Sequence, residues 1–137
     1  MPSLADAALL ILGHGSTQNA ESALPTHLHA LEICRRRIFK EVHVAFWKEE
    51  PNFRAALRPI QAPIVFIVPN FISEGYFTQE IIPRELSLTP PITRTPHHTL
   101  AYCTPVGLHP SMTQALLQRA NEIVSPPPPP LRQPYSS

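Results

Sequence analysis

A histidine between two glycines is the first feature of this sequence that could do chemistry. His14 stands in the run Gly13-His14-Gly15-Ser16, directly after an apolar segment. The glycines let the backbone turn sharply and approach a ligand closely. Ser16 or Thr17 can cap a following helix whose free N–H groups attract anions. An imidazole held there can accept a proton or bind a metal ion near neutral pH, or it can simply complete a turn. The run is too short for a phosphate-binding P-loop, and no Gly-x-Ser-x-Gly elbow of a serine hydrolase is present.

A second segment combines a carboxylate with aromatic rings. Glu74, Gly75, Tyr76 and Phe77 follow one another after a strongly apolar run. This combination suits a flat, apolar ligand with a polar centre, although ordinary aromatic packing and a solvated acid would give the same residues.

A third segment contains Gly107 and His109, and His109 precedes a proline at an expected helix start. The helix dipole favours a neutral imidazole at this position, and a neutral imidazole can bind a metal ion. The alternative is a histidine that only caps the helix.

Alternating strand-like and helix-like segments position these three groups. Four largely apolar segments predict strands buried on both faces, at Ala7–Leu12, Val42–Phe46, Ile64–Val68 and Thr99–Cys103. Helices are expected between and after them, at Asn19–Phe39, Asn52–Leu57, Tyr76–Leu86 and Pro110–Ile123. The alternation predicts an α/β fold with a doubly wound, parallel four-strand sheet and right-handed crossovers. Such sheets bind ligands at the carboxyl ends of their strands, where all three segments should meet together with Trp47–Pro51.

The composition limits the class of protein. The chain has 137 residues, a net charge of +1 and two cysteines, so we expect neither a nucleic-acid partner nor a disulfide framework. No apolar run approaches the length of a membrane span, and a cytoplasmic protein is expected. Residues 1–124 should form one domain, and the proline-rich residues 125–137 should form a disordered tail.

Four blocks of the sequence resemble the CbiX/SirB family of sirohydrochlorin cobaltochelatases and ferrochelatases (class II chelatases), in family order and spacing. They are LLILGHGSTQNAES, VAFWKEEPNFRAAL, VFIVPNFISEGYFTQEIIPREL and PVGLHPSMTQALLQRA, and the likeness spans Ala8–Ala120. The resemblance implies a chelatase-like fold with flavodoxin-like layering. It also implies a lyase that inserts Co²⁺ or Fe²⁺ into sirohydrochlorin in cobalamin or sirohaem biosynthesis. The chain is similar to the small single-domain form that works as a homodimer, with the metal as substrate and no organic cofactor.

The resemblance also assigns roles to residues. His14 matches the first catalytic histidine of the family. The family's second histidine follows Gly-x in the third block, where this sequence has Phe77, and Ile81 stands where an acid usually precedes Ile-Pro. The second metal ligand is therefore either lost or replaced by Glu74, Glu80 or His109.

These observations lead to two hypotheses about the folded part, and a third hypothesis is a structural domain that recruits partners through its proline-rich tail. In the first, a chelatase uses His14 as metal ligand and base, with Glu74 as a catalytic and metal-binding partner and His109 as a further ligand. Its substrate contacts are expected at Gly13, Gly15, Ser16, Gly75, Tyr76, Phe77 and Gly107. In the second, the chain is a non-catalytic member of the family that binds a tetrapyrrole or a metal. Imidazole and carboxylate groups suit Co²⁺, Fe²⁺ and Ni²⁺, so the residue types do not select one metal.

Overall fold

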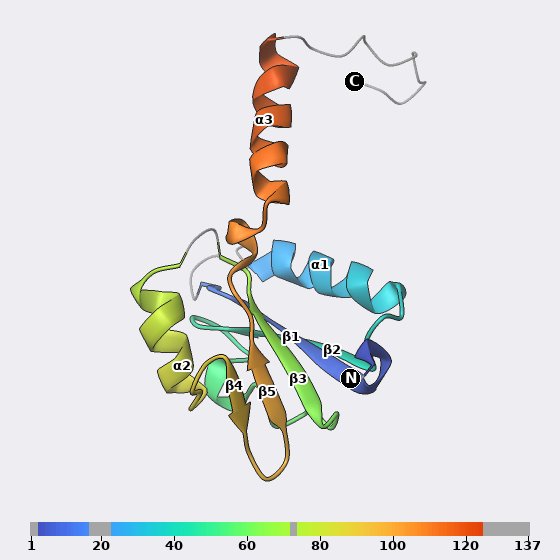
Figure 1. Cartoon of the computed structure of the whole chain (residues 1–137), viewed down its shortest axis with the longest axis vertical. Coiled ribbons are helices and arrows are strands. Elements are labelled where there is room, and N and C mark those ends of the chain that lie inside the picture. Colours follow the sequence, from blue (N-terminus) through green and yellow to red (C-terminus); the bar gives the residue numbers. More distant parts are fainter. Residues whose placement is uncertain (1–2, 17–22, 72–73, 125–137) are drawn as a thin grey trace.

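The structure is a computed structural model that describes residues 3–16, 23–71 and 74–124 (Figure 1). A sheet forms its centre, with helices packed against it and one long helix standing away from it. The tail expected at residues 125–137 lies outside the described residues.

The sheet has five strands in the order β2-β1-β3-β5-β4, and all neighbours are parallel except β4 and β5. The bounds of the strands are β1 Ala7–Gly13, β2 Glu41–Phe46, β3 Ile64–Pro69, β4 Ile92–Arg94 and β5 Thr99–Tyr102. The α/β class and the four predicted strands are confirmed. The predicted number of strands was too small because β4 has only three residues and follows two prolines, so it has no apolar run to reveal it.

The helices differ more from the expectation than the strands do. The helices are α1 Leu24–Arg35, α2 Ile82–Glu85 and α3 Ser111–Val124, with 3-10 turns at Leu4–Asp6, Phe53–Ala55 and Val106–Leu108. The helix α1 ends four residues before the predicted Phe39 because Arg37 takes a left-handed conformation with φ of 55°. The segment expected as a helix at Asn52–Leu57 contains only the short turn Phe53–Ala55.

A π-helical segment, Phe77–Ile81, leads into α2. Pro83 has no N–H and cannot bond to the carbonyl of Gln79 as an α-helix would require. The Ile82 N–H instead donates to the carbonyl of Phe77, five residues back. Single π-helical turns of this kind are frequent at functional sites, and this one sets the position of the Phe77 side chain.

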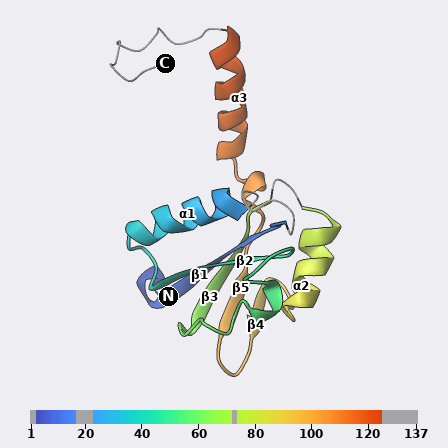
Figure 2. The ribbon, with the colours of Figure 1, turned by 180° about the vertical axis from the view of Figure 1, so that it is seen from behind.

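The main hydrophobic core lies on one side of the sheet. There, Leu10 and Leu12 of β1 and Ile67 of β3 pack with Phe53 and with Ile82 of α2. On the other side, α1 packs over β1 and β2. Helical elements therefore cover both faces of the sheet near β1, as Figures 1 and 2 show from opposite sides. The strand β1 is accordingly buried along its whole length.

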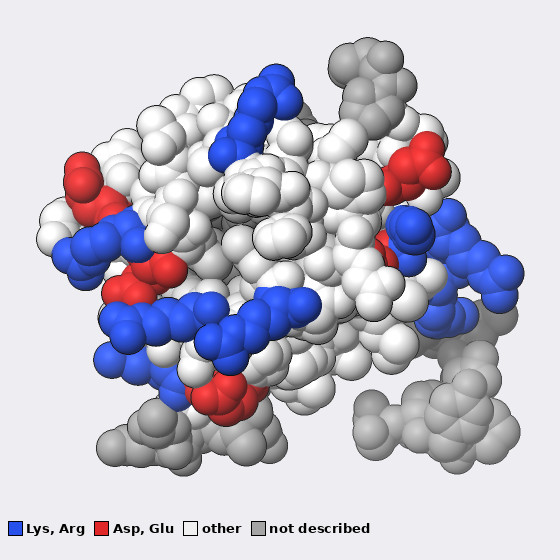
Figure 3. All heavy atoms as spheres, turned by 90° about the horizontal axis from the view of Figure 1, so that it is seen from below, with Lys and Arg blue, Asp and Glu red and all other residues white. Residues whose placement is uncertain are grey.

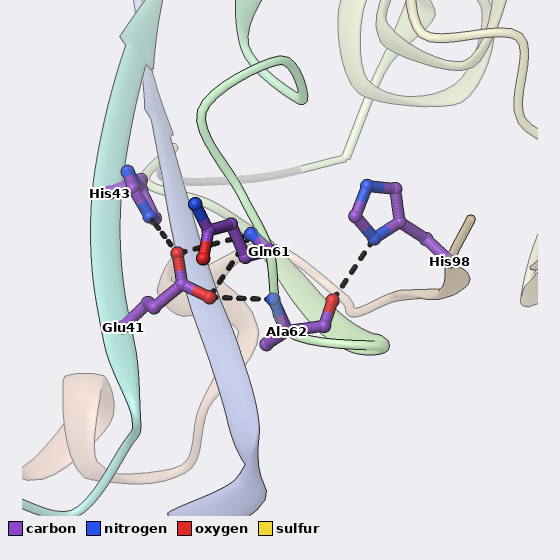
Figure 4. A network of polar contacts seen from close by, with 5 residues as sticks. All are labelled: Glu41, His43, Gln61, Ala62 and His98. Carbon is purple, nitrogen blue, oxygen red and sulfur yellow. Dashed lines mark hydrogen bonds and ion pairs between the residues drawn. The ribbon is translucent and has the colours of Figure 1, made fainter.

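A polar network holds the start of β3 against β2, away from the expected site (Figure 4). The carboxylate of Glu41 accepts hydrogen bonds from the backbone N–H groups of Gln61, at 3.1 Å, and Ala62, at 2.6 Å. The Nε2–H of His43 also donates to Glu41, at 2.9 Å, and the Nδ1–H of His98 donates to the carbonyl of Ala62 at 3.0 Å. Burial alone would raise the pKa of Glu41, but the hydrogen bonds outweigh burial and hold this pKa below its ordinary value.

We expect Glu41→Ala to lower the free energy of unfolding by about 1–3 kcal/mol at neutral pH, because two backbone N–H groups lose their acceptor. A carboxyl whose pKa is lowered by folding stabilises the protein above its ordinary pKa, and the effect disappears as the pH falls through the folded-state pKa. Denaturant titrations of parent and variant should therefore converge in acid. Glu32→Ala is the matched control, since Glu32 is half exposed and pairs only with Arg35 and Arg36 on the surface. A Glu41→Ala variant as stable as the control variant would contradict this role.

The charges on the side of the molecule opposite α3 are mixed in sign. Figure 3 shows Lys and Arg side chains interspersed with Asp and Glu side chains around a largely uncharged middle. Within the described ranges, no helix is long and apolar enough to cross a membrane.

Candidate metal and tetrapyrrole site

His14 lies at the carboxyl end of β1, in a loop that β2 holds in place. The N–H of Lys48 donates to the carbonyl of His14 at 2.8 Å, and the N–H of Trp47 donates to the carbonyl of Gly13 at 3.2 Å. The His14 side chain is exposed, and its Nδ1 lies 3.0 Å from the carbonyl oxygen of Gly15. Because a carbonyl can only accept, Nδ1 carries the proton and Nε2 keeps its lone pair. The loop therefore presents one nitrogen that can accept a proton or bind a divalent metal.

Glu49 fixes the turn that follows His14. Its Oε1 accepts the backbone N–H of Ser16 at 2.8 Å. Gly15 has a φ of +69°, and a Cβ there would lie 2.8 Å from Cγ and 2.9 Å from Oε1 of Glu49. Only glycine combines this backbone conformation with so close an approach. Glu49 is not among the side chains singled out in the sequence, but it lies in the segment Trp47–Pro51 that was expected at this edge, just after β2.

We expect Gly15→Ala to lower the free energy of unfolding by about 1–2 kcal/mol, because alanine is strained in the left-handed region. The added methyl group also meets Glu49, so the Ser16 hydrogen bond and the orientation of His14 should both change. Gly75→Ala is the control, since a Cβ at Gly75 meets nothing within 4 Å. Its effect on unfolding should stay within about 0.5 kcal/mol. Equal losses in the two variants, measured by denaturant titration, would contradict the account of the turn.

Phe77 lies beside His14 and packs within an aromatic cluster. The ring centroids of Phe77 and His14 are 5.9 Å apart. Phe77 also lies 5.6 Å from Trp47, 6.2 Å from Phe53 and 5.2 Å from Phe71, measured between ring centroids. The side chain expected to contact substrate is therefore half-buried next to the imidazole and forms an apolar wall for the site.

Glu74, Gly75 and Tyr76 form an open stretch just before the π-helical segment. All three are exposed, and Tyr76 is 68% exposed. The carboxylate of Glu74 accepts a long hydrogen bond from Gln79 at 3.4 Å. Burial, and after it the negative charge of Glu74, raises the pKa of Tyr102 well above its usual range. Glu74 therefore places its carboxyl group at the same edge of the sheet as His14, in the exposed stretch before the π-helical segment.

His109 occupies the start of α3. Its Nδ1 accepts the backbone N–H of Ser111 at 3.1 Å and lies 2.9 Å from the Ser111 hydroxyl. Nδ1 is thus used as a helix cap, which leaves only Nε2 for any ligand. Gly107 has a connecting role, since its N–H donates to the carbonyl of Phe71 at 2.9 Å and joins the loops after β5 and β3.

The predicted residues converge on one edge of the sheet but do not form a closed metal site. Across residues 3–16, 23–71 and 74–124, no group of three or more His, Cys, Asp or Glu side chains could hold a metal ion. The structure brings His14 next to Phe77, and it places Glu74 and His109 on neighbouring loops without assembling the three as a ligand set. A single open imidazole beside an aromatic wall suits a metal ion that arrives and departs, together with a flat ring that stacks.

Comparisons with known proteins point to one family. The CbiX family model matches residues 8–123. A curated relative named probable sirohydrochlorin cobaltochelatase, from Halobacterium salinarum, is 44% identical over 133 residues, covering 85% of this chain and 46% of the relative. The chain therefore spans about half the length of this relative.

Two solved structures resemble the chain. A multi-domain protein from Deinococcus radiodurans, described as structurally similar to chelatases, has a TM-score of 0.79 and 31% identity, covering 95% of this chain and 30% of that protein. The sirohydrochlorin chelatase SirB from Bacillus subtilis subspecies spizizenii, solved in complex with cobalt, has a TM-score of 0.63 and 24% identity, covering 85% of this chain and 50% of that protein. The second likeness concerns the fold alone. Because the family model matches most of the sequence and the Halobacterium relative is closely similar, the chain belongs to the CbiX family.

Proposed function

We propose that the protein is a lyase that inserts Co²⁺ into sirohydrochlorin, in the cytoplasm, as a step of cobalamin biosynthesis. Fe²⁺, for sirohaem, and Ni²⁺ also suit an imidazole ligand. The observation that supports this proposal most directly is the geometry of His14, whose Nδ1–H is engaged by Gly15 while Nε2 remains open at the strand tip.

Metal insertion exchanges two protons for one divalent cation. The tetrapyrrole loses two pyrrole N–H protons, and the metal takes their place with the same total charge. The Nε2 lone pair of His14 can hold the incoming metal or accept a pyrrole proton, and a neutral imidazole does both near pH 7. The carboxylate of Glu74 is the second group we assign to this step, as a proton acceptor or as a ligand that replaces hydration of the metal. His109 could supply only its Nε2.

The flat ring of the substrate would lie against the aromatic side of the site. Phe77 and Trp47 present apolar surface next to His14, and exposed Tyr76 extends this surface. The substrate's carboxylates would meet nearby cations such as Lys48, whose Nζ lies 5.6 Å from the Trp47 ring. The described site is open on one side, and we propose that a second copy of the chain provides the opposite wall, as in a homodimer.

An absorbance assay tests the activity. Sirohydrochlorin and Co²⁺ are mixed with and without the protein, and the bands of the metallated ring are followed in time. Enzyme-dependent metallation well above the spontaneous rate supports the proposal. A rate equal to the spontaneous one overturns it.

A non-catalytic role is the second candidate, and one observation favours it. Phe77 occupies the position of the family's second histidine, and its ring packs with Trp47, Phe53 and Phe71, so it cannot bind metal. The same assay separates the two functions. A shift of the sirohydrochlorin spectrum on adding protein alone, without faster metallation, would identify a tetrapyrrole-binding member of the family.

A further inference from the structure

A hollow of about 230 Å³ lies beside Trp47, the residue that follows β2. The turn after Asn52 and the helix α2 pack against each other and supply its other walls (Figure 1). The Trp47 ring lies 5.6 Å from that of Phe77, and the Phe77 ring lies 5.9 Å from that of His14, measured between centroids. The hollow therefore adjoins the aromatic wall of the candidate site, two ring contacts from His14. Its lining residues are Trp47, Asn52, Phe53, Arg54 and Glu85.

An ion pair fixes the one cation that lines this hollow. The Nε–H of Arg54 donates to Oε2 of Glu85 at 2.9 Å. The side chain of Glu85 is only 11% exposed, whereas that of Arg54 is 80% exposed. An ion pair whose cation stands in solvent adds little to stability. The pair therefore serves to orient Arg54, because the carboxylate is held within the protein and the guanidinium group faces outward.

This orientation leaves one edge of the guanidinium group available. Glu85 occupies Nε, and no residue of the described ranges accepts a hydrogen bond from the two terminal amino groups of Arg54. These two groups form a planar fork, which binds a carboxylate through two parallel hydrogen bonds. A lysine ammonium group carries the same charge but cannot provide this geometry.

The two acidic residues of the adjoining loop have partners of their own. Oε1 of Glu49 accepts the N–H of Ser16 at 2.8 Å. The carboxylate of Glu50 accepts the side-chain amide of Asn52 at 3.0 Å and its backbone N–H at 3.2 Å. Both carboxylates are thus hydrogen-bonded within the carboxyl edge of the sheet, so neither depends on Arg54.

A flat ring with acidic groups on its rim fits this arrangement. Trp47 offers an aromatic surface on which such a ring can stack. Two cations flank it: Arg54 lies across the hollow, and the Nζ of Lys48 lies 5.6 Å from the centre of the Trp47 ring. Aromatic surface and cations together match a tetrapyrrole whose side chains end in carboxylates.

We propose that Arg54 binds a carboxylate on the rim of the tetrapyrrole, and that this contact selects tetrapyrroles with many acidic side chains. Glu85 orients the guanidinium group for this contact. The inference rests on the proposed function and adds the residue that recognises the acidic side chains of its substrate. Because Arg54 binds the rim and not the reacting centre, its loss should affect KM and leave kcat nearly unchanged.

Quenching of tryptophan fluorescence tests the contact directly, because Trp47 is the only tryptophan of the chain and lines the hollow. The probe is uroporphyrin, a stable tetrapyrrole with an acetate and a propionate on every pyrrole ring. Arg54→Gln should raise the Kd for uroporphyrin about ten- to a hundredfold, since a hydrogen-bonded ion pair is lost. Arg58→Gln is the matched control and should bind as the parent does, because Arg58 is also exposed but does not line the hollow.

Two further variants separate recognition from support of the fold. Glu85→Gln can still accept the Nε–H of Arg54 and carries no charge, so it should bind uroporphyrin at least as tightly as the parent. Arg54→Lys keeps the charge without the fork, and its affinity should lie between those of the parent and Arg54→Gln. An Arg54→Gln variant that binds like the parent, or like Arg58→Gln, would overturn the assignment. Equal weakening in Arg54→Gln and Glu85→Gln would also overturn it, because the ion pair would then only support the structure.

The absorbance assay with sirohydrochlorin and Co²⁺ distinguishes a failure of this inference from a failure of the proposed function. In Arg54→Gln, KM for sirohydrochlorin should rise about tenfold or more while kcat stays close to that of the parent. A parent that binds uroporphyrin through Arg54 but inserts no metal would overturn the proposed chelatase and leave the carboxylate contact standing. Metal insertion with the same KM in the parent and Arg54→Gln would do the reverse. A parent that binds no uroporphyrin would overturn the contact, whatever the result of the absorbance assay.

Discussion

Replacing His14 by alanine should abolish catalysed Co²⁺ insertion into sirohydrochlorin. After subtraction of the uncatalysed background, the rate of the variant should be about 10²–10⁴-fold lower than that of the parent. The Nε2 lone pair of His14 is the group we assign to metal binding and proton transfer, and alanine offers no substitute. The free energy of unfolding should change by no more than about 0.5 kcal/mol, because the exposed ring contributes its one hydrogen bond to the adjacent Gly15 carbonyl.

His97→Ala is the control for this variant. His97 is also exposed, but it lies in the turn between β4 and β5, at the opposite edge of the sheet. The His97→Ala variant should insert Co²⁺ at the same rate as the parent. If His14→Ala and His97→Ala insert Co²⁺ equally fast, the reaction does not take place at the strand tips where we locate it.

Phe77→His should tighten Co²⁺ binding by about ten- to a hundredfold, which corresponds to about 1.4–2.8 kcal/mol. The ring centroids of Phe77 and His14 lie 5.9 Å apart. An imidazole at position 77 can therefore share a metal ion with His14 after a modest side-chain rotation. Imidazole is planar and similar in size to the phenyl ring it replaces. The loss of aromatic packing with Phe71 and Trp47 should cost some stability, and calorimetric titration with Co²⁺ measures the gain separately from that cost.

Three further variants complete this experiment. Phe77→Leu removes the same ring without adding a ligand and should bind Co²⁺ no more tightly than the parent. If Glu74 or His109 already replaces the missing histidine, Phe77→His should do little, and Glu74→Gln or His109→Ala should weaken binding instead. Equal Co²⁺ affinity in the parent and all of these variants would place the metal elsewhere.

Much of this architecture can be inferred from local pattern. The apolar runs at β1 and β3 identify strands because a continuous apolar stretch of that length can be buried only within a layered fold. Their parallel order then sends the Gly-His-Gly loop and the segment around Phe77 to the same edge. The departure at Phe77 follows from the resemblance to the family, which implies a histidine at this position, since phenylalanine has no group that binds a metal.

Other features depend on contacts between residues far apart in the sequence. The strand β4 is defined by its antiparallel pairing with β5, because three residues after two prolines show no period of their own. Glu49 acquires its role because the pairing of β1 with β2 brings it within 2.8 Å of the Ser16 N–H, 33 residues away. His109 shows the same dependence: a histidine before proline suits a ligand or a cap, and the hydrogen bond from the Ser111 N–H makes it a cap.

The burial of β3 depends both on the local sequence pattern and on contacts with distant parts of the chain. Its sequence is apolar at every position from Ile64 to Val68, and this pattern indicates cover on both faces. Whether a face is covered depends on where the helices pack, and here α3 leads away and leaves Phe66 and Val68 half-buried. An amino-acid sequence determines which side chains favour burial, because the removal of apolar surface from water lowers the free energy. Which surface covers them is set by the path of the chain in space.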